Sequence, residues 1–184
     1  MVNILTNILK PFLSRPNDRI HLLEMSRLLK IPHPTLRLWL NGLCKENILL
    51  KEKKGRLTLY YLNFSNPSLF DYLVIAEKKV LMEQIEHSLV LKELKEYIYN
   101  EIDAKVLIFG SAAVSIEKAN DIDILIIGSY DKKKLKYIGD RLNLDLHVIN
   151  VSSFAKIKDS LKKEIISKHI IIKNSEELVR WLFW

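Results

Sequence analysis

The sequence predicts an α+β protein made of two differently patterned parts that are joined by a helical connector. Residues 1–65 carry three helical periodicities and a hairpin, residues 66–102 are apolar and helical, and residues 103–184 alternate strands with helices around a small mixed sheet. The net charge of +7 falls entirely on the first part, which holds 11 Lys and Arg against 4 Asp and Glu. The remaining residues hold 18 of each sign. Two patterns and one charge asymmetry therefore predict two domains and a connector.

Composition limits the class of protein. The 184 residues are 48% hydrophobic, which is enough for a buried core and excludes a disordered chain. No apolar run approaches the roughly 18 residues that a membrane helix needs, and the first residues lack the basic leader and small-residue cleavage site of a signal peptide. The single Cys44 cannot form an internal disulfide, which is typical of a reducing compartment. We expect a cytoplasmic protein with no membrane partner, in which Cys44 is a small buried residue.

The first part is predicted to contain three helices followed by two strands. Leu36, Leu40 and Leu43 follow one another at i, i+4 and i+7, so the third helix has a core stripe. Pro32 ends the preceding element, and Pro34 fits the first turn of a helix. The helices are expected over 1–14, 20–29 and about 34–46, and the strands over 48–53 and 56–62 with Lys54–Gly55 at the tip.

The outward face of the third helix and the hairpin turn carry the polar and basic residues. The segment from Ile31 to Asn63 resembles winged helix-turn-helix domains of archaeal and bacterial transcription regulators, and the resemblance covers about residues 3–65. It implies a recognition helix in the major groove of duplex DNA beside a wing on the phosphates. A docking or dimerisation module is the alternative, and a homodimer that reads two half-sites is expected. The expected DNA contacts are His33, Thr35, Arg37, Leu38 and Asn41 from the helix, with Lys53, Lys54 and Arg56 from the wing.

The connector and the second part follow a different pattern. The connector is too apolar for a flexible tether, so we expect its helices to pack on the second domain, on the first domain or on a second subunit. After it, strands are expected over 106–109, 121–128, 144–149 and 169–173, and helices over 131–142, 153–168 and 175–183.

Carboxylates mark the candidate site of the second part. Asp121 and Asp123 alternate with isoleucines, so both carboxylates lie on one face of a strand. Two crowded carboxylates repel unless a cation lies between them, and Mg²⁺ or Mn²⁺ accepts such ligands together with substrate phosphates. Asp145 alternates in the same way on a neighbouring strand and is expected to complete the site. Upstream, Gly110 and Ser111 precede a short helix whose free N–H groups would bind phosphate.

The run FGSAAVSIEKANDIDILIIG resembles the signature of polymerase-β-type nucleotidyltransferases, with nine residues between Ser111 and Asp121. The resemblance covers about residues 88–180 and is to the minimal, single-domain members. It implies that Asp121, Asp123 and Asp145 are catalytic metal ligands, that Gly110 and Ser111 bind an NTP such as ATP, and that a nucleoside monophosphate is transferred to an acceptor. It also implies a possible separate all-helical partner protein.

One departure from that signature leaves two hypotheses open. Minimal members carry Arg-Gly shortly after Gly-Ser, whereas this sequence has Val114 and Ser115 there, so a candidate triphosphate contact is missing. The first hypothesis is a metal-dependent nucleotidyltransferase coupled to a DNA-binding domain. The second is a DNA-binding regulator or antitoxin-like protein whose second domain binds nucleotide or a partner without turnover.

Overall fold

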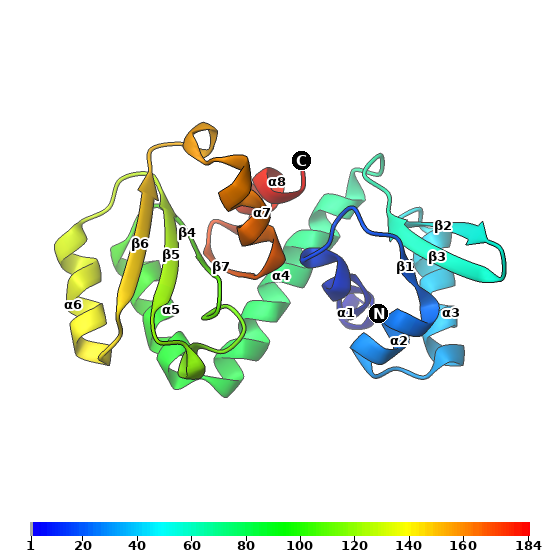
Figure 1. Ribbon diagram of the computed structural model, residues 1–184, viewed down its shortest axis with the longest axis horizontal. Coiled ribbons are helices and arrows are strands. Elements are labelled where there is room, and N and C mark those ends of the chain that lie inside the picture. Colours follow the sequence, from blue (N-terminus) through cyan, green and yellow to red (C-terminus); the bar gives the residue numbers. More distant parts are fainter. Residues whose placement is uncertain (1) are drawn as a thin grey trace. The chain divides into compact units, whose positions relative to one another are not determined.

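The computed structural model describes the backbone of residues 2–184 and the side chains of residues 6–184. Within these residues the chain forms two compact units, Met1–Ala76 and Glu77–Trp184, and each is described by itself. Each unit combines helices with one small sheet, so the predicted α+β class is confirmed (Figure 1).

The first unit contains three helices and a three-stranded antiparallel sheet. As predicted, Leu36, Leu40 and Leu43 are fully buried along one side of the third helix. The sheet has the order β1-β3-β2, and Gly55 forms the turn between its long strands with a φ of +61°, which a glycine adopts without a Cβ clash. The helices are α1 (Val2–Leu13), α2 (Leu22–Leu29) and α3 (His33–Lys45); the strands are β1 (Ile20–His21), β2 (Leu49–Lys54) and β3 (Leu57–Leu62).

The strand β1 is a correction to the predicted helix over 20–29. Ile20 pairs with Tyr60 and His21 with Leu59, and α2 begins only at Leu22. The His21 ring accepts a hydrogen bond from the Leu23 N–H at 3.2 Å, which caps the new helix end. Two residues are too few to show the alternation of a strand, so β1 can be identified only from its pairing with β3. The first helix was predicted to include Met1 and the apolar side chains of Ile4 and Leu5. Both parts of that prediction lie outside the described residues.

The second unit surrounds a four-stranded mixed sheet with helices. The sheet order is β6-β5-β4-β7, where β5 and β6 are parallel and the other pairs antiparallel. Its strands are β4 (Lys105–Phe109), β5 (Ile122–Ile127), β6 (Leu146–Val151) and β7 (His169–Lys173). The helical elements are α4 (Ser68–His87), whose first residues belong to the first unit, then α5 (Leu89–Glu101), η1 (Ile116–Lys118), α6 (Lys132–Leu142), η2 (Phe154–Lys156), α7 (Asp159–Ser167) and α8 (Ser175–Phe183).

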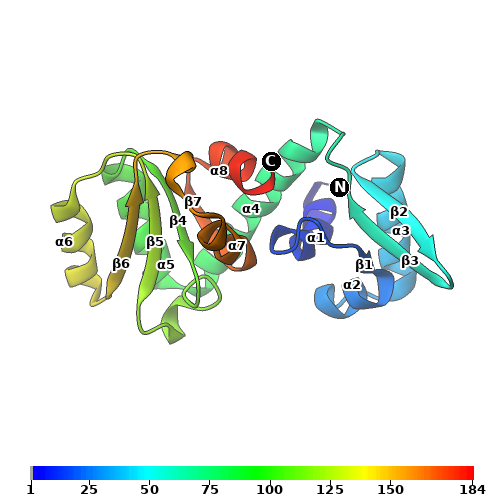
Figure 2. The same cartoon turned by 45° about the horizontal axis from the view of Figure 1, so that its top comes forward.

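The two faces of this sheet are covered by different helices. Alternate residues of β5, such as Ile122, Ile124 and Ile126, pack in one cluster with residues of α5 and α6. The opposite face is covered in part by α8, which contacts β4 and β7 (Figures 1 and 2). Because side chains alternate along a strand, Asp123 lies on the face opposite to α5 and α6.

The predicted helical connector consists of α4 and α5. Leu81 of α4, with Leu91 and Leu94 of α5, belongs to the core of the second unit, so this part of the connector packs on the sheet as expected. Glu77 and His169 form a buried pair between α4 and β7, with 2.9 Å between His169 Nε2 and Glu77 Oε1. None of the described helices is both long and apolar enough to cross a membrane.

Two elements of the second unit differ from their predicted bounds by more than one residue at an end. The helix predicted over 153–168 is split into η2 and α7, with Ile157 and Lys158 extended between them. The strand predicted over 144–149 begins at Leu146 and continues to Val151, because β6 pairs with β5 along this whole length. This shift decides which side chain of β6 reaches the candidate site.

Candidate functional site

The site is built first on β5. Asp121 directly precedes this strand and Asp123 is its second residue, so both carboxylates lie on the face that the core cluster leaves free. The side chain of Asp123 is 26% exposed. As the alternation predicted, the structure brings the two aspartates together, and no cationic side chain is hydrogen-bonded between them among the described contacts.

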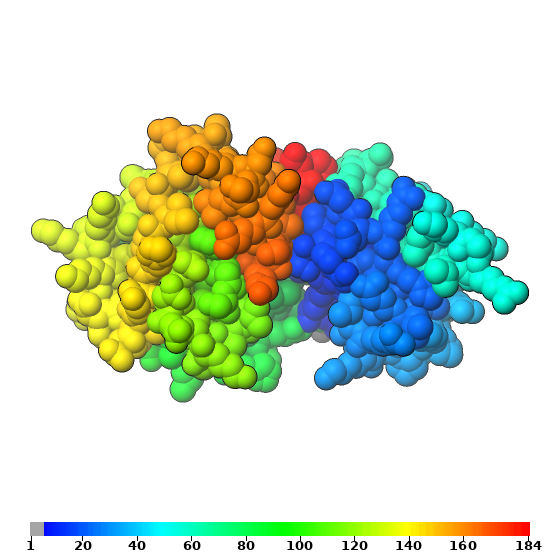
Figure 3. Space-filling view, viewed as in Figure 1, coloured from blue at the N-terminus to red at the C-terminus, as the bar shows by residue number. Residues whose placement is uncertain are grey.

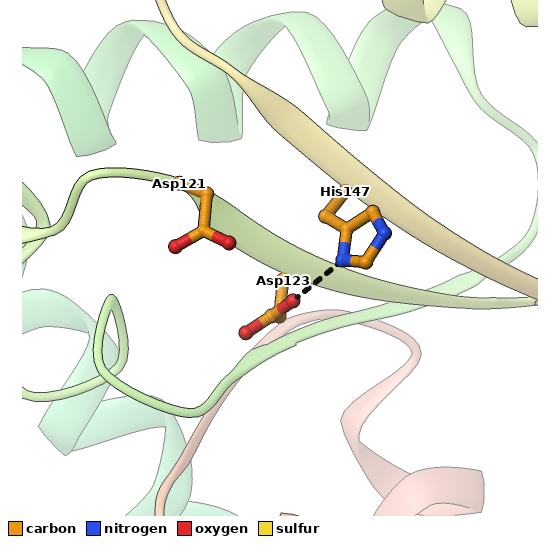
Figure 4. A group of neighbouring side chains, drawn as sticks. All are labelled: Asp121, Asp123 and His147. Carbon is orange, nitrogen blue, oxygen red and sulfur yellow. Dashed lines mark hydrogen bonds and ion pairs between the residues drawn. The ribbon is translucent and has the colours of Figure 1, made fainter.

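The third member of the group comes from β6. In the parallel ladder His147 is the partner of Asp123, and their side chains meet with 3.2 Å between His147 Nδ1 and Asp123 Oδ1. One ligand atom from each of Asp121, Asp123 and His147 lies within 4.8 Å of the others. Figure 4 shows the three side chains on the same side of the two strands. The His147 side chain is 75% exposed, so its ring can exchange this contact for another ligand without loss of core packing.

Asp145 is not a member of this group, although the sequence favoured it as the third ligand. Asp145 precedes β6, its side chain is exposed, and its carbonyl oxygen accepts the Ile122 N–H at 2.8 Å. The register pairs His147, two residues later, with Asp123. Asp145 and His147 are two residues apart in the predicted strand 144–149, so the alternation places both on the same face. The sequence therefore allowed His147 as well, and only the register of β6 against β5 decides between the two.

Gly110 gives the Asp123 carboxylate its space. Its φ is +72°, and a Cβ at this position would lie 2.9 Å from Asp123 Oδ2, closer than real Cβ contacts. The Gly110 N–H donates to the Lys168 carbonyl at 3.2 Å, so this group is already satisfied. The glycine therefore leaves room for the carboxylate, while its assignment to a nucleotide site stays a prediction in which its own N–H takes no part.

The segment after Gly110 also differs from the expected helix start. Ser111 is exposed, and its carbonyl accepts the N–H groups of Val114 and Ser115 at 3.0 and 3.3 Å. This is one hydrogen-bonded turn, and η1 begins only at Ile116. Val114, which stands where minimal nucleotidyltransferases have arginine, is 64% exposed. The Ser111 hydroxyl is the remaining predicted phosphate contact that faces solvent here.

The donor set fits a divalent metal ion. Two carboxylates and an imidazole supply oxygen and nitrogen ligands from two adjacent, hydrogen-bonded strands. Two ligands that share one ion at about 2.0–2.2 Å lie roughly 2.8–3.5 Å apart, and the 3.2 Å between His147 Nδ1 and Asp123 Oδ1 falls in this range. Gly110 lies so close to the Asp123 carboxylate that only a residue without a Cβ fits there.

A second candidate site lies on the first unit, between α3 and the hairpin. A hollow of about 470 Å³ is lined mainly by basic and polar residues from both elements, together with the acidic Glu52 and with His21 and Leu22. Lys51 Nζ donates to Asn41 Oδ1 at 3.2 Å and so orients the amide of α3. The space-filling view shows the hairpin, in cyan, at the surface of this unit (Figure 3). The lining includes Arg37 and Asn41 of α3, Lys51 and Lys53 of β2, and Arg56 and Thr58 beyond the turn. We call these six residues the basic groove.

The other predicted DNA contacts lie around this basic groove. Leu38 is exposed on α3, with 70% of its surface accessible. His33 and Thr35 are half-buried at the start of the same helix. Lys54 is exposed at the end of β2 and does not line the groove. Burial raises the pKa of the Tyr60 phenol on the groove floor, so this hydroxyl is neutral at physiological pH.

Comparisons with known proteins add little. No protein-family model matches the sequence, and no curated protein sequence matches it. A solved structure of TrmBL2, an archaeal chromatin protein with a novel mode of DNA binding, is similar at 12% identity over 88% of this chain and 73% of that chain. The TM-score is 0.26, and a likeness this low carries no argument about the function of this chain.

Proposed function

We propose that the second unit binds a divalent metal ion with a nucleoside triphosphate and transfers a nucleoside monophosphate to an acceptor. The observation that carries this proposal is the group of Asp121, Asp123 and His147, whose ligand atoms lie within 4.8 Å of one another, with Gly110 close to the Asp123 carboxylate. A bound ion would stabilise the charge that develops on the phosphoryl oxygens and position the in-line attack. Asp121 and Asp123 would hold the ion, and the exposed Ser111 hydroxyl would contact a phosphate oxygen.

In the experiment, the metal-stripped full chain is titrated with Mn²⁺ and Mg²⁺, alone and with ATP, and binding is measured by calorimetry. We expect binding in the wild type and its loss in Asp123→Asn, because the amide keeps the shape of the side chain but removes the charge. Transfer is then measured with labelled NTPs and protein, RNA and small-molecule acceptors. Equal metal binding in the wild type and Asp123→Asn would contradict the site.

A specific observation supports a form of the protein that binds nucleotide without transferring it. The group lacks a third carboxylate, since His147 occupies the place at which Asp145 was expected, and Val114 supplies no charge for a triphosphate. In that form metal and ATP bind with the same dependence on Asp123, but no acceptor is labelled. The two readouts of the titration and the transfer assay separate these functions.

We propose further that the first unit binds duplex DNA. The basic groove is the observation that supports this, because Arg37, Lys51 and Lys53 converge on one hollow with the Asn41 amide beside them. Cations in this arrangement suit phosphates, and Arg37, Leu38 and Asn41 suit base edges. Binding should weaken steeply with salt. Fluorescence anisotropy with a labelled duplex at about 50–200 mM salt measures this, and salt-independent binding would contradict it. A homodimer on two half-sites and a separate helical partner stay predictions.

A further inference from the structure

The metal site differs from an all-carboxylate site in one ligand. Its members are two aspartates and the imidazole of His147, which lies on β6 opposite Asp123. The ring is largely exposed and makes one described contact, from Nδ1 to Asp123 Oδ1. Even as an ion pair, a solvent-exposed contact contributes only about 0–1 kcal/mol, so this contact of His147 adds little to protein stability.

We infer that this site selects a first-row transition metal, such as Mn²⁺, Co²⁺ or Zn²⁺, over Mg²⁺. This inference rests on the proposed metal site of the second unit and names the class of ion that the site takes. Mg²⁺ is a hard cation that prefers oxygen ligands, whereas imidazole is a favourable ligand for transition metals. Exchanging a third carboxylate for a neutral imidazole also removes one negative charge, which weakens the site for Mg²⁺ more than for ions that bond well to nitrogen.

The backbone holds the nitrogen in place for this role. Asp123 and His147 are partners on adjacent parallel strands, so the ladder fixes the spacing of their Cα atoms. The 3.2 Å between the two ligand atoms suits a shared ion, and Asp121 lies on the same face two residues before Asp123. Asp121 and His147 can rotate toward a shared ion, because neither side chain is buried.

The test compares the metal preference of the wild type with that of His147→Asp. The metal-stripped full chain is titrated with CoCl₂, MnCl₂ and MgCl₂ by calorimetry. Most sites favour Co²⁺ over Mg²⁺ to some degree, so the quantity of interest is the ratio of the two affinities in each protein. We expect His147→Asp to lower the Co²⁺ to Mg²⁺ ratio at least tenfold, by weaker Co²⁺ binding and stronger Mg²⁺ binding. Asp121→Asn is the control, and it should weaken binding of both ions together.

A direct spectroscopic signal accompanies the titration. Coordination of Zn²⁺ by the His147 ring shifts its ¹⁵N resonances in the wild type, and this signal does not depend on activity or on the folding of a variant. The inference would be overturned by an unchanged Co²⁺ to Mg²⁺ ratio in His147→Asp together with wild-type His147 ¹⁵N resonances that do not shift on addition of Zn²⁺. In that case metal binding through the two aspartates would still be observed. Metal binding that is insensitive to Asp121→Asn would instead refute the proposed site itself.

Discussion

Replacement of Gly110 by alanine tests whether metal binding requires the close approach of this glycine to the Asp123 carboxylate. An alanine at φ +72° costs about 1–2 kcal/mol, because the left-handed conformation brings its Cβ close to the backbone. The new Cβ also lies 2.9 Å from Asp123 Oδ2, whereas ordinary contacts begin at 3.4 Å, so the carboxylate has to move by about 0.5 Å. Metal–ligand distances tolerate about 0.2 Å. The variant should therefore lose stability and metal affinity together.

The assay separates these two effects with a matched variant. Gly55→Ala introduces the same kind of strain at φ +61°, but no atom lies within 4 Å of its added Cβ. Unfolding in urea should show a loss of about 1–2 kcal/mol in each variant. Calorimetry with Mn²⁺ should show at least a tenfold loss of affinity in Gly110→Ala and none in Gly55→Ala. Wild-type Mn²⁺ affinity in Gly110→Ala would refute the reasoning that the missing Cβ at Gly110 leaves necessary space for the Asp123 carboxylate.

Three further predictions concern the groove, the core and a buried pair. Arg37→Ala with Lys53→Ala should weaken duplex binding and reduce the salt slope by about 2, as measured by anisotropy. Leu40→Ala should cost about 2–5 kcal/mol in urea unfolding, since Leu40 is fully buried in α3. Burial alone would lower the pKa of His169, but Glu77 and backbone acceptors raise this pKa above 6.5. The pair's contribution to the free energy of unfolding is therefore fully present below pH 6.5 and is lost as the pH rises through the raised pKa. Urea unfolding at several pH values should show this slope, and Glu77→Gln should flatten it.

Local patterns made much of this fold predictable from sequence. The stripe of Leu36, Leu40 and Leu43 identified the buried side of α3, because helix periodicity is set within a few residues. The alternation of Asp121 and Asp123 with isoleucines likewise placed both carboxylates on one face of β5, because strand periodicity is local too. The strand β7 and the helix α8 have the predicted bounds for the same reason.

Features that depend on strand pairing were less accessible. The short strand β1 exists only through its partner β3, and two residues are too few to show the alternation of a strand. The choice between Asp145 and His147 required the register of β6 against β5, two strands that are joined through α6. The partner of the Gly110 N–H is the Lys168 carbonyl, which is far away in sequence. In each case the deciding contact is long-range.

The same long-range contacts connect the buried pair to the candidate site. Glu77 of α4 holds the His169 ring at 2.9 Å, and His169 begins β7 opposite Phe109 of β4. The neighbouring Lys168 carbonyl accepts the N–H of Gly110, and Gly110 in turn leaves room for the Asp123 carboxylate. Removing the charge of Glu77 leaves a buried histidine without its counter-charge, which destabilises this end of β7. We expect Glu77→Gln to affect metal binding through Gly110. The losses of metal affinity in Glu77→Gln and Gly110→Ala should therefore be non-additive in the double variant, because the two residues belong to one chain of contacts. Additive losses would show that the pair stabilises the unit without positioning the site.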